Sequence, residues 1–335
     1  MLKKIIPLAL LCVLLTGCGK EKQVYQTVFL DVFDTVTTLR GYEEDEETFR
    51  RRSDQVHQAL TEYHRLFDIY NDHPGGLKEV NDHAGKAPVK VETPVLDLLE
   101  DCRRDYERTG GKVNAAMGSV LYLWHQAREA GLNDPEHAAL PDMEELREAA
   151  QHTSFDTVLI DREAGTVYLT DPQQRLDVGA IAKGWAAQRV SQLLPQGYML
   201  NVGGNVCTRG AKPDGSKWNI AVQSPNVGEE NLCVVSLAGQ SLVTSGDYQR
   251  YYVVDGQRLH HIIDPETLMP AAHARAVTII APESDLADGL STAVFVLPYE
   301  EGRALIDSLS DVEALWYLPD GTIHMTEGFA GYIVE

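Results

Sequence analysis

Four short segments of the sequence combine charged, hydroxyl or histidine side chains with glycine in patterns that could do chemistry. In residues 177–184 (DVGAIAKG), a β-like run ends at Asp177, a glycine allows a sharp turn, and a helix begins with Lys183 in its first turn. The N–H groups of a helix N-terminus, together with a lysine, favour a bound pyrophosphate. Taken alone, this stretch is better explained as an ordinary strand, turn and helix, and no GxGxxG or P-loop motif is present.

A second segment, residues 287–293 (ADGLSTA), places a carboxylate and a hydroxyl one helical turn apart. Asp288 and Thr292 lie four residues apart in a predicted helix over residues 285–297, so their side chains share one face. This oxygen pair suits Mg²⁺, which favours few protein ligands together with water and substrate phosphates. Taken alone, the segment is better explained by an exposed Asp288 on the helix surface and a Thr292 hydroxyl bonded to the preceding turn.

The third segment places two histidines after a predicted hairpin. Residues 245–251 (SGDYQRY) lead into a DG turn at 255–256, and residues 260–265 (HHIIDP) follow it. Alternation along a strand puts His260 and His261 on opposite faces, so one of them can face a site. Adjacent histidines are more often ordinary strand residues than ligands. The arginine, aspartate and histidine side chains around this hairpin nevertheless make it more polar than a purely structural strand needs to be.

The fourth segment, residues 201–205 (NVGGN), ends a predicted strand with paired glycines. Paired glycines let another backbone or a flat ligand approach closely. A plain β-turn explains them equally well, so the segment alone assigns no ligand.

Hydrophobic periodicity predicts mixed helices and strands without an internal repeat. Apolar residues recur at helical spacing in residues 43–67, 92–109, 144–150, 181–194 and 285–297. Strand-like runs cover residues 28–39, 157–161, 166–170, 198–202, 218–223, 232–237, 251–254, 259–263 and 276–280. This order predicts an α+β fold with a large mixed or antiparallel sheet flanked by helices. No linker rich in Pro, Gly or Ser divides it, so we expect one compact body, whether or not it has two lobes.

The charge balance of the chain limits its partners. The 335 residues include 29 Lys and Arg against 50 Asp and Glu, which gives a formal net charge of −21. Binding to a nucleic-acid backbone is driven by clustered cations, so we set a nucleic-acid partner aside. Anionic small molecules remain compatible, because backbone N–H groups, one lysine or a metal can hold phosphate inside a cleft.

The first residues are predicted to direct the chain out of the cytoplasm. Two lysines precede an apolar run that is too short to span a bilayer, which is typical of a secretory signal. Residues 15–18 (LTGC) resemble the lipobox of bacterial lipoproteins; an ordinary secretory signal is the alternative. We expect a signal peptide over residues 1–17, lipid on Cys18, a tether over residues 18–26 and the folded domain over residues 27–335. The chain would be exported and lipid-anchored to the cell membrane on its extracytoplasmic side.

Taken together and in this order, the segments resemble the FAD:protein FMN transferase family, the ApbE-like flavin transferases. The most specific matching stretches are residues 177–184, 245–248, 261–265 and 287–292. Enzymes of this family cleave FAD, release AMP and attach FMN through its phosphate to a Thr or Ser hydroxyl of a partner flavoprotein, using Mg²⁺. An FAD pyrophosphatase that releases FMN and AMP, and a flavin-binding lipoprotein without turnover, share these motifs and stay open.

The resemblance implies roles for individual residues. Asp288, Thr292 and the backbone carbonyl of Ala180 would hold Mg²⁺. His261 is the candidate base near the acceptor hydroxyl. The residues implied at FAD are Phe33, Tyr70, Ala115, Ala116, Met117, Asp177, Lys183, Ile262 and Ser291.

The chain also departs from the family pattern. Asn114 and Ala116 stand where the family commonly has Asp and Thr, so we expect only backbone contacts to the flavin in this stretch. Asp68 stands where Ser or Thr is frequent. The resemblance does not say what this carboxylate does.

Overall fold

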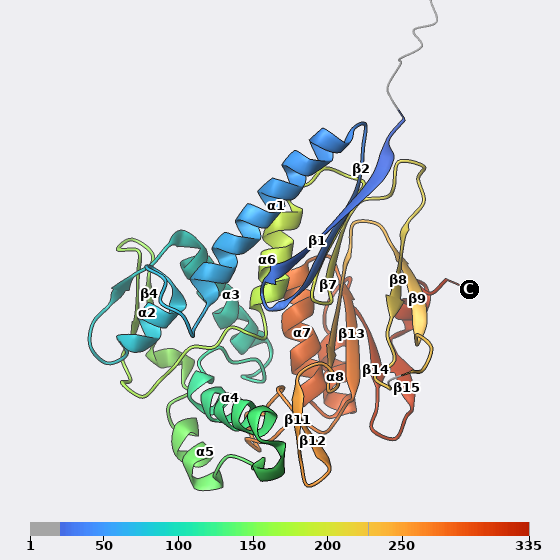
Figure 1. Ribbon diagram of the computed structural model, residues 1–335. Helices are drawn as coiled ribbons and strands as arrows, with labels where there is room; N and C mark the ends of the chain where they lie inside the picture. Colours follow the sequence, from blue (N-terminus) through green and yellow to red (C-terminus); the bar gives the residue numbers. More distant parts are fainter. Residues whose placement is uncertain (1–20, 227, 335) are drawn as a thin grey trace, which may run out of the picture.

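The computed structural model describes residues 21–226 and 228–334, and an eight-stranded sheet forms its centre (Figure 1). The strand order is β1-β2-β6-β7-β10-β13-β14-β15, and each neighbouring pair is antiparallel. The strands are β1 (Gln23–Val32), β2 (Thr35–Glu43), β6 (Tyr198–Val202), β7 (Asn205–Arg209), β10 (Ser241–Gly246), β13 (Ala276–Ala281), β14 (Glu313–Tyr317) and β15 (Ile323–Met325). The predicted α+β class with a large antiparallel sheet is therefore confirmed.

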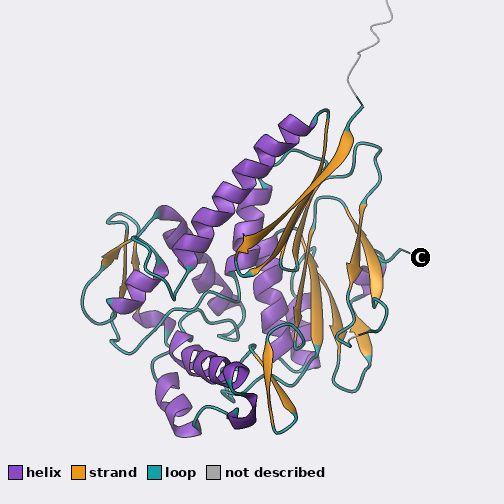
Figure 2. Cartoon of the chain, in the orientation of Figure 1, coloured by secondary structure: helices purple, strands orange, loops and turns teal. Residues whose placement is uncertain are grey.

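Helices cover one face of this sheet and a hairpin covers part of the other (Figure 2). The covering helices are α1 (Glu46–Phe67), α6 (Ala182–Ser191) and α7 (Ser284–Val296), with α8 (Tyr299–Asp307) packed beside α7. The hairpin β8 (Trp218–Val222) and β9 (Cys233–Leu237), with α9 (Glu327–Ala330), lies on the opposite face. Ile279 and Ile280 of β13 show the alternation: the first packs with α7 and the second with the hairpin.

A second region, mainly helical, lies beside the sheet (Figure 1). Its helices are α2 (Leu77–Asp82), α3 (Thr93–Arg108), α4 (Gly118–Asn133) and α5 (Met143–Ala150), with 3₁₀ turns at Pro135–His137 and Phe155–Thr157. A small sheet pairs β5 (Thr166–Leu169) with both β3 (Val89–Lys90) and β4 (Val158–Asp161). The hairpin β11 (Tyr251–Val254) and β12 (Gln257–His260) packs against α4.

One hydrophobic core joins the two regions into a single body. Leu99 and Cys102 of α3 pack in the same cluster as Trp185 of α6 and Ala293 of α7. These side chains are almost completely removed from solvent, so the helical region is held against the sheet by continuous apolar contact. The three cysteines after Cys18 are all free thiols.

The start of the folded body differs from the sequence prediction. β1 begins at Gln23, so residues 23–26 belong to the sheet rather than to the predicted tether. Tyr25, in this stretch, stacks on Phe49 of α1 with ring centroids 5.5 Å apart. Cys18 lies outside the described residues. No helix in the described part of the chain is long and apolar enough to cross a bilayer.

Candidate functional site

The segments around Lys183 and Asp288 meet where α6 packs against α7. The two helices are antiparallel, and polar contacts one turn apart connect them. The Gly184 N–H donates to Oδ2 of Asp288 over 2.7 Å, and the Ser284 N–H donates to Oε1 of Gln188 over 2.9 Å. These contacts fix the register of α7 against α6 and place Asp288 beside the N-terminus of α6.

Glycine is required at position 184 because the two helices approach so closely. A Cβ atom there would overlap the Cβ of Asp288 and would lie 2.5 Å from the carbonyl oxygen of Ser284. Any larger residue would push α7 away from α6. The glycine therefore makes the contact between Asp288 and the first turn of α6 possible.

Asp288 is a buried residue, contrary to the expectation that it lies on the helix surface. Its exposed fraction is 3%. Burial raises the pKa of Asp288, while the charge of Lys183 and the N–H of Gly184 act to lower it. A carboxylate held here, with only one oxygen bound by the protein backbone, would gain from a cation.

The other two residues implied as magnesium ligands present unused oxygens. Thr292 lies one helical turn after Asp288 and is half-buried. Ala180 lies in the turn before α6 and is also half-buried. Among the hydrogen bonds between described residues, none uses the Thr292 hydroxyl or the Ala180 carbonyl.

Ser291 lies at the site but uses its hydroxyl inside the protein. Its Oγ lies 2.7 Å from Oγ of Ser245 and donates to the Asp288 carbonyl over 2.9 Å. The side chain is fully buried. Ser291 thus ties α7 to β10 and contacts the backbone of Asp288.

His261 reaches solvent immediately after β12. The carbonyl of Arg250 accepts a hydrogen bond from the His261 backbone N–H over 3.1 Å and lies 3.2 Å from Nδ1 of its ring. The surrounding protein, followed by the positive charges of Arg250 and Lys183, lowers the pKa of His261 to about 3. His261 is therefore a neutral imidazole that shares its electrostatic environment with Lys183.

The neighbouring His260 points the other way, as the alternation predicted. It is buried, its Nε2 lies 2.9 Å from the Ala271 carbonyl, and its Nδ1 accepts from the Ile262 N–H over 3.3 Å. Its ring meets Phe295 edge-on. The strand itself ends at His260, so the predicted strand over residues 259–263 is wrong beyond that residue, and Ile262 is a core residue packed near α7.

Asp177 and Tyr70 come together on the side of the site that faces α4. Asp177 precedes the turn into α6, and its Oδ1 accepts from the Gly179 N–H over 2.8 Å. Burial raises the pKa of Asp177, and burial together with the charge of Asp177 raises the pKa of Tyr70 to about 12. The Tyr70 ring lies 4.7 Å from that of His125 on α4 and is half exposed, so it offers an aromatic face.

Asp68, which departs from the family pattern, shapes the turn that carries Tyr70. Its carboxylate accepts from the backbone N–H groups of Tyr70 (2.7 Å) and Asn71 (3.1 Å) and from the Asn71 side chain (2.8 Å). Although burial acts to raise it, these hydrogen bonds hold the pKa of Asp68 below its usual value. Asp68 is an ionised anchor for this loop.

Backbone hydrogen bonds fix residues 115–117 beside Asp177. The Asp177 N–H donates to the Ala115 carbonyl over 2.8 Å, and Met117 forms a parallel bridge with Arg175. The Asn114 side chain accepts from the Ala116 N–H over 2.9 Å and donates to the Thr153 carbonyl over 2.9 Å. Asn114 therefore holds the loop through both ends of its side-chain amide.

Phe33 occupies the tight turn between β1 and β2. Phe33 and Asp34 both have positive φ angles, 55° and 49°, as a two-residue hairpin turn requires. The Phe33 N–H donates to Nδ1 of His64 over 2.9 Å. Gly203 of the NVGGN segment lies against Thr35 beside this turn, where a Cβ would overlap the threonine side chain. Gly203 thus serves the close approach of two turns, whereas Gly204 has open space around it and a positive φ of 96°.

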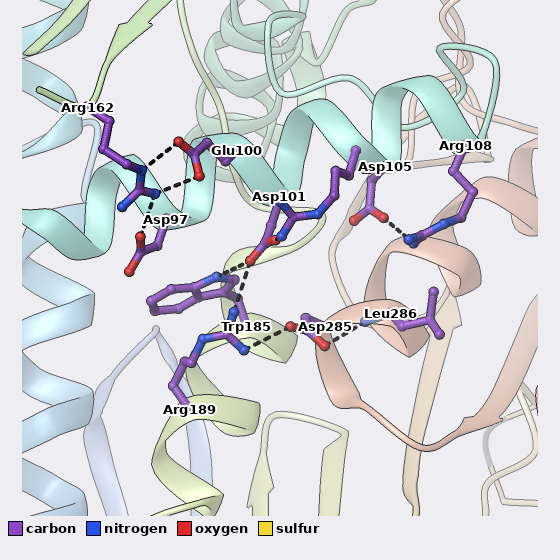
Figure 3. Close-up of polar contacts among 11 residues, drawn as sticks. Asp97, Glu100, Asp101, Asp105, Arg108, Arg162, Trp185, Arg189, Asp285 and Leu286 are labelled. Atoms are coloured by element: carbon purple, nitrogen blue, oxygen red, sulfur yellow. Dashed lines mark hydrogen bonds and ion pairs between the residues drawn. The ribbon is translucent and has the colours of Figure 1, made fainter.

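Figure 3 shows a polar network that joins α3, α6 and the first turn of α7, which precedes Asp288 by one turn. The Trp185 indole N–H donates to Oδ2 of Asp101 over 2.8 Å, and Arg189 bonds the same oxygen over 3.0 Å. Arg189 also reaches Asp285, in the first turn of α7, over 3.1 Å. Arg104 completes the network through an ion pair with Asp101.

Comparison with known proteins identifies the family of this fold and site. The family model described as the ApbE family matches residues 33–316. The chain belongs to the ApbE family. It is 34% identical to the FAD:protein FMN transferase of Treponema pallidum, over 95% of this chain and 92% of that protein. It is 32% identical to an FAD:protein FMN transferase of Klebsiella pneumoniae, over 83% of this chain and 84% of that protein.

Solved ApbE structures have the same fold. The ApbE protein of Thermotoga maritima superposes with a TM-score of 0.83 at 29% identity, covering 93% of this chain and all of that one. The flavinyl transferase ApbE of Pseudomonas stutzeri superposes with a TM-score of 0.77 at 25% identity, covering 93% of this chain and 97% of that one. The similarity to the ApbE family thus extends over nearly the whole chain.

Sequence reasoning missed some residues at the site. The His125 ring lies tilted against the Tyr70 ring, and the charge of Arg250 acts on Tyr70, Asp177 and His261. Arg250 lies in the SGDYQRY segment, so the sequence could have indicated that it lies at the site. His125 gave no such indication, because the helix that carries it was not predicted.

Proposed function

We propose that this protein transfers FMN from FAD to a Thr or Ser hydroxyl of an acceptor flavoprotein and releases AMP, with Mg²⁺ bound at Asp288. The observation that carries the proposal is the convergence of three segments. Lys183, Asp288 and His261 come from separate stretches of sequence, yet the charge of Lys183 acts on both other residues. Membership of the ApbE family and the names of its relatives support the transferase activity.

The oxygen set around Asp288 fits magnesium. It offers one carboxylate, the Thr292 hydroxyl and the Ala180 carbonyl. No group of three His, Cys, Asp or Glu side chains suited to a metal occurs among the described residues. Mg²⁺ keeps most of its water and substrate-phosphate ligands, so a site with few protein oxygens suits it better than zinc. Bound there, Mg²⁺ would neutralise charge on the FAD pyrophosphate.

The geometry of His261 assigns the basic atom. The Arg250 carbonyl can only accept, so Nδ1 carries the proton in its contact with that oxygen, and Nε2 keeps a free lone pair. Nε2 takes the proton of the acceptor hydroxyl while the hydroxyl oxygen bonds to the FMN-side phosphorus. The bond from that phosphorus to the bridging oxygen breaks, and AMP leaves. Lys183 supplies a positive charge near the phosphates. Most of the rate enhancement comes from holding the acceptor hydroxyl and the phosphorus in position to react.

A product assay tests this function. The chain lacking residues 1–17 is mixed with FAD, MgCl₂ and a candidate acceptor domain, and the acceptor is analysed by mass spectrometry. Transfer predicts a mass gain equal to FMN, together with AMP, and no gain on an acceptor whose target threonine is replaced by valine. Release of free FMN and AMP without modification would instead establish an FAD pyrophosphatase. FAD binding without AMP would establish a binding protein.

We also propose that the chain is exported and anchored to the cell membrane by lipid on Cys18. The small residues before this cysteine follow an apolar run, as lipid modification requires. Cys18→Ala should leave the protein soluble or unprocessed. The check is fractionation of cells and detection of lipid on the mature N-terminus; unchanged membrane anchorage of the variant would contradict the proposal.

A further inference from the structure

Arg189 is the one side chain that bonds α3 and α7 together from α6 in the network of Figure 3. It lies five residues after Gly184, and its partner Asp285 lies three residues before Asp288. Its guanidinium spans from Asp101 Oδ2 (3.0 Å) to Asp285 Oδ2 (3.1 Å) and lies 4.8 Å from the centre of the Trp185 ring. Both carboxylates are largely buried.

The position of Arg189 matters because, among the described residues, few side-chain hydrogen bonds join the closely packed helices α6 and α7. Beyond the close approach of Gly184 to Asp288, the Gln188 contact with the Ser284 backbone is the other polar link of this kind. Asp285 also accepts from the Leu286 N–H over 3.0 Å, so it binds both Arg189 and a backbone N–H in the first turn of α7. A shift of the first turn of α7 would move Asp288 directly.

We propose that Arg189 is a positioning residue for the magnesium site: by clamping α7 to α6 and α3 it holds Asp288 in register with the first turn of α6. This inference rests on the proposed magnesium-dependent function. It adds a residue that touches neither FAD nor the metal. Arginine suits the role because its planar fork binds two carboxylates at once, which the single ammonium of lysine does less well.

Whether Mg²⁺ affinity falls or rises when Arg189 is replaced distinguishes a positioning role from a purely electrostatic one. Arg189 is a cation near the metal site, so its removal would by Coulomb attraction alone strengthen the binding of Mg²⁺. If Asp288 instead loses its register with α6, the affinity for Mg²⁺ should fall. Removing a side chain that holds a metal ligand in place commonly weakens metal binding by 10- to 100-fold. In an Arg189 variant, Arg104 still forms its ion pair with Asp101, so Asp285 of α7 is the residue that loses its partner.

The experiment measures Mg²⁺ affinity by titrating MgCl₂ calorimetrically into the FAD-saturated protein. Arg189→Met keeps an unbranched apolar side chain but removes the guanidinium, with both carboxylate contacts and its position over the Trp185 ring. We expect its dissociation constant for Mg²⁺ to rise about 10-fold, with FAD affinity in EDTA changed less than about twofold. The matched control is Arg162→Met, because Arg162 pairs with Asp97 and Glu100 of the same α3 but does not reach α6 or α7. Its Mg²⁺ affinity should be unchanged.

Further variants keep the inference open to refutation. Val294→Ala lowers stability through the buried face of α7 without touching the clamp, so its Mg²⁺ affinity should stay near wild type. If Arg189→Met does not fold, Arg189→Lys provides the test, with a weaker but measurable loss expected. Unchanged or tighter Mg²⁺ binding in the Arg189 variants, or equal weakening in Val294→Ala, overturns the inference alone. Absence of Mg²⁺ binding by the wild type overturns the proposed magnesium site as well.

Discussion

At the residue level, the buried position of Asp288 determines what its substitutions should do. Asp288→Asn keeps an oxygen for the Gly184 N–H but loses the charge, so transfer should fall about 10²-fold or more with thermal stability nearly unchanged. Asp288→Ala also leaves that buried N–H unpaired, which should cost about 1–3 kcal/mol of unfolding free energy. Transfer rates and thermal melts of both variants are the measurements. Near-normal transfer by Asp288→Asn at low Mg²⁺ would show that the carboxylate binds no metal.

The lowered pKa of His261 gives a second expectation at this level. With a pKa of about 3, the imidazole is almost entirely neutral from pH 5 upward, so its titration does not affect the rate between pH 5 and 8. His261→Ala should slow transfer by about 10²–10⁴-fold and keep FAD binding. The pH profiles of wild type and variant should run parallel from pH 5 to 8. A wild-type acid limb near pH 6.5 that disappears in the variant would contradict the lowered pKa but support the base role, whereas transfer by His261→Ala at the wild-type rate would refute the base assignment.

The orientation of these residues could be predicted from the sequence, but their burial and their contacts could not. The opposite orientation of His260 and His261 followed from alternation, and the structure confirms it. The burial of Asp288 could not be predicted, because it depends on a glycine in another helix that lets α6 approach. The anchoring role of Asp68 likewise depends on the fold of the loop after α1. Which of the predicted residues contact FAD or the metal stays a prediction.

At the level of elements, the α6–α7 contact yields a stability prediction. Gly184→Ala places a methyl group against Asp288 and Ser284, so the helices must separate. We expect a loss of about 1–3 kcal/mol in unfolding free energy and a weaker Mg²⁺ dependence of transfer. Gly302→Ala in α8 is the control, because its nearest side-chain atom is 3.2 Å from the new methyl and no Asp288 contact is involved. Equal stability of the two variants would contradict the account of this contact.

Sequence periodicity found five of the helices and missed others, including the amphipathic α8. α1, α3, α5, α6 and α7 begin and end within a few residues of their predicted bounds. The missed α4 begins at Gly118 and mixes apolar residues with charges, and it buries Trp124 and Val120 against the β11–β12 hairpin. β7 and β10 are buried central strands without regular alternation of polar residues. Their places follow from tertiary pairing, which no local pattern contains.

For the whole molecule, the position of β1 predicts where the folded body must start. Gln23 pairs with Glu43 and Tyr25 stacks on Phe49, so these residues belong to the folded body. A chain that starts at residue 27, the boundary expected from sequence, should melt at a lower temperature than a chain that starts at residue 21. The difference should reach several degrees, because about 1 kcal/mol shifts the melting temperature of such a domain by a few degrees. Identical melting curves would place residues 23–26 outside the cooperative unit.

The order of strands in the large sheet has a kinetic consequence. β1 and β2 form a hairpin at the start of the chain, but the other side of β2 pairs with β6, where Thr37 lies opposite Val202. The whole helical region lies between them in sequence, so closing this pairing joins very distant residues and costs chain entropy. Folding should therefore be slow and limited by the β2–β6 junction. Until residues 198–202 arrive, the edge of β2 stays open to pairing with other chains, in addition to β1, which remains an edge strand of the finished sheet.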